Sequence, residues 1–152
     1  MQTIISHSTM IRCNIMDLFG YITKPWLWHE WQPHSLCQIP PQELRIGDQF
    51  CENITITPFR TFPIKVSQNP IYEVMEIYPN QKWVLKGKFQ NSDIQISYEF
   101  KPITNTKTKF IKTMTVNTKG SETVLHPLLH LYLQHRSNKS ISQLKQTCER
   151  RF

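Results

Sequence analysis

The chain has little of what marks nucleotide-binding and metal sites. Glycine accounts for only 4 of its 152 residues, and no P-loop, dinucleotide-binding, G-x-S-x-G or H-E-x-x-H motif is present. Its 4 cysteines stand far apart, without the C-x-x-C pair typical of zinc sites and redox dithiols. These absences argue against nucleotide chemistry, serine hydrolysis and a zinc site, so we expect no metal and no cofactor.

Long apolar runs are also missing. No segment approaches the roughly 18 consecutive apolar residues of a membrane span, and residues 1–10 lack the basic and apolar regions of a signal peptide. We therefore expect a cytoplasmic protein with no integral membrane segment. The 39% hydrophobic and 19% charged residues are typical of a globular protein, and a length of 152 residues predicts a single domain.

The net charge of +7 is concentrated in the second half of the chain. Residues 1–60 carry 4 basic and 5 acidic side chains, whereas residues 61–152 carry 14 basic and 6 acidic ones. Much of the excess is in lysines, most of which alternate with apolar residues: Lys82, Lys86, Lys88, Lys101, Lys107, Lys109 and Lys112. This alternation predicts a solvent-exposed outer face of a sheet. Because no nucleic-acid-binding motif accompanies the charge, we expect no nucleic acid partner.

The order of the predicted elements is that of an α+β protein. β-branched residues predict a strand over residues 3–11, and Asn14 is a suitable N-cap for a short helix that ends before Pro25. A second short helix is expected within residues 24–31, followed by a loop over residues 32–47.

Residues 48–119 have the two-residue period of strands, of which we expect five or six. Pro58 and Pro63 break this region, and a hairpin turn is predicted around Asn91. The clearest alternation places four residues on one face: Ile94, Ile96, Tyr98 and Phe100. The last part of the chain has helical periodicity, and since proline is tolerated in the first turn, this long helix is expected to begin at His126 or Pro127.

Four short segments carry a resemblance to a known superfamily. They are residues 11–21, Trp28-His29-Glu30-Trp31-Gln32-Pro33, Gly47-Asp48-Gln49-Phe50 and Ile141-Ser142-Gln143-Leu144-Lys145-Gln146-Thr147-Cys148-Glu149. In this order and spacing they resemble the SRPBCC, or START-like, superfamily, specifically its small polyketide cyclase/dehydrase-like members. The resemblance covers nearly the whole chain.

This resemblance implies a helix-grip fold, in which a curved seven-stranded antiparallel sheet wraps a long C-terminal helix and two short helices follow the first strand. Residues 1–152 would then form a single START-like (SRPBCC) ligand-binding domain. A cone-shaped cystatin/NTF2-like fold is the alternative, although its helices generally precede most of the sheet, whereas here a strand comes first and the longest helix last.

The resemblance also implies a deep hydrophobic cavity between the sheet and the helix, where a hydrophobic small molecule or lipid binds. A concave sheet and one helix cannot fill their interface as densely as two flat layers do, which favours the same conclusion. The side chains expected to line this cavity, or simply to fill it as core, are Trp83, Leu85, Tyr98, Phe100, Phe110, Met114, Leu129, His130 and Leu133.

Three charged residues interrupt the inward-facing apolar pattern: Glu52, Glu76 and Lys112. A charge on a cavity wall is costly unless it is paired or hydrated. Each of the three therefore either holds a polar group of the ligand or acts in proton transfer, or is turned out to solvent by a β-bulge or a strand end.

Binding of an apolar ligand is the first functional interpretation, and we assign no catalytic residue. The second is a polyketide cyclase or aromatase-type enzyme that uses Tyr98, His130 or Lys112 to move protons. The third is a protein-interaction module in which the lysine-rich sheet face, including Lys86 and Lys88, binds a partner. The sequence predicts no particular oligomeric state.

Overall fold

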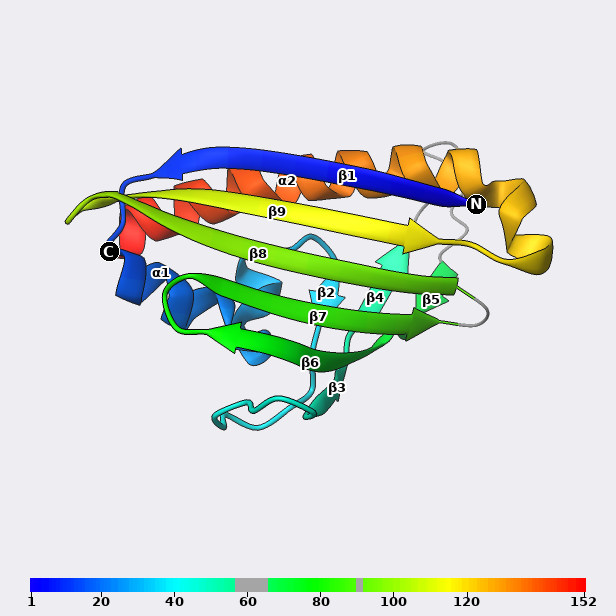
Figure 1. The fold of residues 1–152 in the computed structure, drawn as a ribbon, viewed down its shortest axis with the longest axis horizontal. Coiled ribbons are helices and arrows are strands. Elements are labelled where there is room, and N and C mark those ends of the chain that lie inside the picture. The colour runs from blue at the N-terminus through cyan, green and yellow to red at the C-terminus, as the bar shows by residue number, and fades with distance from the viewer. Residues whose placement is uncertain (57–65, 90–91) are drawn as a thin grey trace.

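A long antiparallel sheet lies against one long helix in the computed structural model, which describes residues 1–56, 66–89 and 92–152 (Figure 1). The six strands of this sheet run in the order β1-β9-β8-β7-β6-β3, and a second, three-stranded sheet has the order β2-β4-β5. The strands are β1 (Gln2–Ile11), β2 (Ser35–Leu36), β3 (Gln49–Cys51), β4 (Asn53–Ile56), β5 (Val66–Gln68), β6 (Ile71–Tyr78), β7 (Lys82–Phe89), β8 (Ser92–Thr104) and β9 (Lys107–Asn117). The helices are α1 (Ile15–Ile22) and α2 (His126–Arg151), with the 3₁₀ helices η1 (Pro25–Glu30) and η2 (Gly120–Leu125).

The first helices form where the sequence predicts them. The side-chain oxygen of Asn14 accepts a hydrogen bond from the backbone N–H of Met16 at 2.9 Å, which caps the start of α1. The second expected helix is the 3₁₀ helix η1, with Pro25 in its first turn. The indole N–H of the buried Trp28 donates to the carbonyl of Ile22 at 2.9 Å and so joins η1 to α1.

The inner face of the long sheet is the one that the alternation predicts. Along β8, the residues Ile94, Ile96, Tyr98 and Phe100 are all buried. The neighbouring strand β9 buries its own alternate residues: Thr108, Phe110, Lys112, Met114 and Val116. Together these residues of β8 and β9 form the buried face against which α2 and the two short helices pack, because one face of each strand must be removed from water.

The predicted count of seven strands differs from the nine strands found in the described part of the chain, because two strands are interrupted. One break is at Glu52, between β3 and β4, and the other at Asn69 and Pro70, between β5 and β6. The backbone N–H of Glu52 donates to the carbonyl of Pro70 at 3.1 Å, while Pro70 itself has no N–H for a ladder bond. Beyond the breaks, β4 pairs with β5 on one side and with β2 on the other, and β2 interrupts the loop expected over residues 32–47.

The long helix α2 begins at His126, as the position of Pro127 predicts. It runs behind β1 and β9 in Figure 1 and buries a stripe of residues against the sheet: Leu133, Ser137, Ser140, Ile141, Leu144 and Cys148. No helix in the described ranges is both long enough and apolar enough to cross a membrane.

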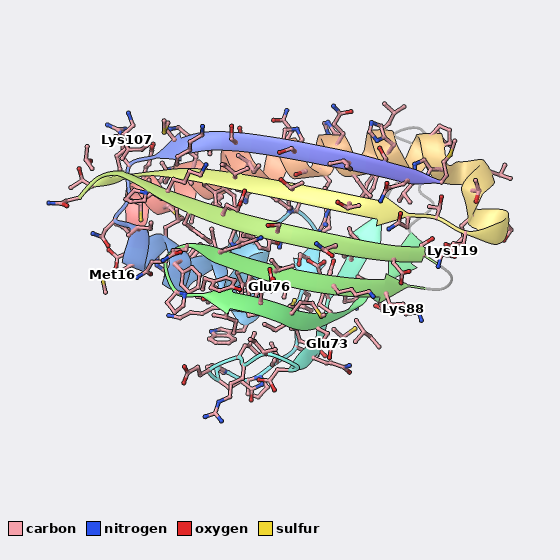
Figure 2. All side chains as sticks on the ribbon, viewed as in Figure 1. Met16, Glu73, Glu76, Lys88, Lys107 and Lys119 are labelled. Atoms are coloured by element: carbon pink, nitrogen blue, oxygen red, sulfur yellow. The ribbon has the colours of Figure 1, made fainter. Side chains whose placement is uncertain are left out.

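Most of the lysines predicted to be solvent-exposed are so: Lys86 is exposed, as are Lys88 and Lys107, which Figure 2 labels. Lys112 is the exception, since only 2% of its surface is exposed and it lies on the inner face. The expected strand breakers Pro58 and Pro63 and the turn residue Asn91 lie outside the described residues.

Gly87 on β7 is required for close packing, and its replacement by alanine is expected to destabilise the protein. A Cβ atom there would lie 2.6 Å from Cε1 of Tyr72 and 2.7 Å from Cγ2 of Ile94, so the Tyr72 ring must shift. We expect Gly87→Ala to lower the free energy of unfolding by about 1–3 kcal/mol in urea denaturation. The matched control is Gly20→Ala in α1, where nothing lies within 4 Å, and it should raise stability by about 0.5–1 kcal/mol. Equal stability of Gly87→Ala and the wild type would contradict this packing argument.

Candidate functional site

A cavity of about 80 Å³ lies between the inner face of the long sheet, the small sheet and α2. Most of its wall is apolar, and the apolar side chains come from β4, β8, β9 and α2. Among them are Ile54, Ile94, Ile96, Met114, Leu129 and Leu133. Charged and polar side chains also reach the wall, among them Gln32, Glu52, Lys112 and Arg136. A mainly apolar hollow with a few convergent polar groups is the usual form of a small-molecule site.

Glu52 is the centre of the polar part of the wall. Its side chain faces inward in alternation with Phe50 and Ile54, and 1% of its surface is exposed. One carboxylate oxygen accepts a hydrogen bond from the Tyr72 hydroxyl at 3.1 Å. The other accepts one from the Ser35 hydroxyl and lies 3.5 Å from Nη2 of Arg136. Three partners therefore compensate the burial of this carboxylate.

Lys112 projects from the middle of β9 into the same region. Its register partners are His7 on β1 and Tyr98 on β8, and its Nζ lies 6.0 Å from the centroid of the Tyr98 ring. Within the described ranges, no hydrogen bond or ion pair to Lys112 is formed. Burial, together with the positive charge of Arg136, lowers the pKa of Lys112 to about 7.

Glu76 faces the opposite way from Glu52 and Lys112. A β-bulge between Val74 and Glu76 shifts the register, so that Glu76 pairs with Val84 on the outer side of the sheet. Its side chain is 44% exposed and lies 3.7 Å from the ammonium of Lys82 (Figure 2). Of the three charged residues that interrupt the apolar pattern, two thus face the cavity and one faces solvent.

The predicted ligand-binding residues fall into three groups. Met114, Leu129 and Leu133 line the cavity. A second group, Trp83, Leu85, Tyr98, Phe100 and Phe110, is buried in the core beyond the cavity wall.

His130 is separate from both groups. Its Nδ1 lies 2.6 Å from the Thr3 hydroxyl on β1, and it does not line the cavity. Within the second group, the Tyr98 ring stacks between those of Trp83 and Phe110, with centroids 5.7 and 6.0 Å away.

Two polar lining residues on α2, Tyr132 and Arg136, were not among the predicted ones. The sequence did contain a signal for Arg136, because it follows Leu129 and Leu133 at the helical spacing i, i+4, i+7. Gln32 and Tyr72 gave no comparable signal, since one lies in a loop and the other at an ordinary core position of a strand. In the described part of the chain, no three His, Cys, Asp or Glu side chains are close enough to hold a metal ion.

Replacing Lys112 with methionine is expected to stabilise the protein, and more so at pH 6 than at pH 9. The folded-state pKa of about 7 is below the ordinary value of 10.5, so the cost of burying the charge is complete below pH 7 and decreases as the pH rises toward 10.5. We expect the free energy of unfolding to increase by about 1–3 kcal/mol at pH 6, measured by urea denaturation.

The matched control for this substitution is Lys109→Met, on the outer face of the same strand. Because Lys109 is partly exposed, its removal should change stability by less than about 0.5 kcal/mol at either pH. An equal effect of Lys112→Met at pH 6 and pH 9 would show that the buried amine is not the titrating group.

Comparison with known proteins gives no match in sequence and many in structure. No protein family and no curated protein matches the chain. Among solved structures, the Zhui aromatase/cyclase from Streptomyces sp. R1128 aligns over 99% of this chain and 96% of its own, with a TM-score of 0.75 and 8% identity. A START superfamily protein from Mycobacterium smegmatis aligns over 98% of this chain and 99% of its own, with a TM-score of 0.71 and 13% identity.

A third structure has two domains of this kind. The di-domain ARO/CYC StfQ from the steffimycin biosynthetic pathway aligns over 99% of this chain and 52% of its own, with a TM-score of 0.73 and 16% identity. At such low identities the shared property is the fold. The chain therefore has the helix-grip fold that this START superfamily protein and these aromatase/cyclases share.

Proposed function

We propose that the chain binds a hydrophobic small molecule or lipid in the cavity between the long sheet and α2. The observation that carries this proposal is the composition of the wall, where apolar side chains of the sheets face those of the helix across an unfilled space. Each square ångström of apolar ligand surface removed from water there contributes about 25 cal/mol. The likeness to a START superfamily protein and to aromatase/cyclases supports the same function.

The size of the cavity restricts the ligand. Its volume of about 80 Å³ is below the roughly 300–1,000 Å³ of common ligand pockets. A compact molecule is therefore favoured, and a larger one requires side chains of the wall to move. Leu129 and Tyr132 are the best placed to do so, because both are only partly buried and both belong to α2.

The proposal predicts that the purified protein carries a ligand. Native mass spectrometry should show a stoichiometric mass above that of the polypeptide, and extraction into organic solvent should release an apolar compound. A mass equal to that of the polypeptide, unchanged after incubation with fatty acids, sterols and polyphenols, would contradict binding in this cavity.

A bulky substitution in the cavity wall provides the matching mutational test. Leu129→Trp is expected to abolish the extra mass, because the indole occupies the space of the ligand. The control is Leu128→Trp, at a neighbouring position of α2 that is 59% exposed, and it should retain the ligand. Equal retention by both variants would show that the compound binds elsewhere.

A second candidate function is that of a polyketide cyclase or aromatase, and the observation that favours it is the buried Lys112 in the cavity wall, where burial lowers the pKa of the amine to about 7. Neutral Lys112 could remove a proton from a carbon between two carbonyl groups of a poly-β-ketone. Formation of an aromatic product should then increase with pH, with a midpoint near 7. Lys112→Met should lower the rate about 100-fold or more, and full activity of this variant would exclude the enzymatic role.

A further inference from the structure

The cavity wall holds more positive than negative charge. Glu52 and Lys112 are buried, and Arg136 has only 11% of its side chain exposed. The carboxylate of Glu52 is engaged by the Arg136 guanidinium and two hydroxyl groups, so these two charges compensate each other. Lys112 has no ion-pair partner anywhere in the described residues, which leaves one positive charge uncompensated when the amine is protonated.

Unused hydrogen-bond donors lie on the wall that includes Lys112 and on the strand beside it. Nε of Arg136, the side-chain nitrogen of Gln32 and the hydroxyl of Tyr98 are buried and lack a partner in the described part of the chain. Arg136 and Gln32 line the cavity together with Lys112, and Tyr98 is the register partner of Lys112 on β8. Buried donors without acceptors are costly, so the chemical group that this wall lacks is an acceptor.

We propose that the ligand of the cavity is an apolar molecule with a carboxylate, whose oxygens accept hydrogen bonds from Lys112, Arg136 and Gln32. A carboxylate carries the single negative charge that balances Lys112, and its two oxygens accept several hydrogen bonds at once. The apolar body then lies against Met114 and Leu133. This inference rests on the proposed function, because it names the chemical class of the ligand for the same cavity.

Binding of a carboxylate should change the protonation of Lys112. The charged or titratable groups that face Lys112 are His7 on β1, Tyr98 on β8, Arg136 on α2, and Glu52 between β3 and β4. Burial, with a contribution from Lys112, lowers the pKa of His7, and burial raises the pKa of Tyr98, so neither gains a charge between pH 7 and 9. A bound anion favours the charged amine, so above pH 7 binding should take up close to one proton.

Isothermal titration calorimetry with matched probes tests the inference. The probes are hexanoate, octanoate and decanoate, each compared with the primary alcohol of the same length. At pH 6.5 the best carboxylate should bind at least about tenfold more tightly than its alcohol. Above pH 7 its affinity should decrease by roughly tenfold per pH unit, with proton uptake visible in buffers of different ionisation enthalpy.

Two lysine variants complete the experiment. Lys112→Met should remove both the preference for the carboxylate and the proton uptake, whereas Lys109→Met on the outer face of β9 should leave both unchanged. If acid and alcohol bind the wild type equally, water satisfies the donors; the inference is then wrong while the proposed function stands. If neither kind of probe binds, the inference is wrong, and native mass spectrometry with sterols and polyphenols decides the proposed function. A preference for the acid that survives in Lys112→Met would also overturn the inference.

Discussion

The buried carboxylate of Glu52 is the interaction on which the rest of the site depends. It joins three layers, because it accepts hydrogen bonds from Ser35 in the small sheet and from Tyr72 in the long sheet, and pairs with Arg136 on α2. Glu52 faces inward in alternation with Phe50 and Ile54, and its backbone N–H donates to the carbonyl of Pro70 at the break between β3 and β4. The small sheet, the long sheet and α2 therefore meet at one buried charge, which is the centre of the polar part of the cavity wall.

Next to Glu52, a closely packed part of the core adjoins a cavity whose polar groups reduce the stability of the fold. The aromatic rings near Tyr98 stack on one another, whereas the neighbouring cavity is lined by the buried Lys112 and by Gln32 and Arg136, each of which has a buried nitrogen without a partner among the described residues. Such groups reduce stability unless something binds to them. Gln32 and Arg136 carry such groups and line the cavity beside Lys112, and a few convergent polar groups in an apolar hollow are typical of a binding site.

The sequence predicted the parts of the fold that depend on local periodicity. The inner face of β8, the cap at Asn14 and the start of α2 follow from nearest neighbours along the chain, and the structure confirms them. The strand breaks and the outward bulge at Glu76 depend on partners that are distant in sequence, as does the pairing of Arg136 with Glu52. Alternation can identify the residues that face inward, but not which of them border an unfilled space.

The most direct test of this account is the crystal structure of the protein with the tightest-binding carboxylate. The account predicts electron density between α2 and the inner face of the long sheet, with the apolar chain against Met114 and Leu133 and the carboxylate within hydrogen-bond distance of Lys112. Density at the outer surface only, with the cavity filled by water or collapsed, would contradict it.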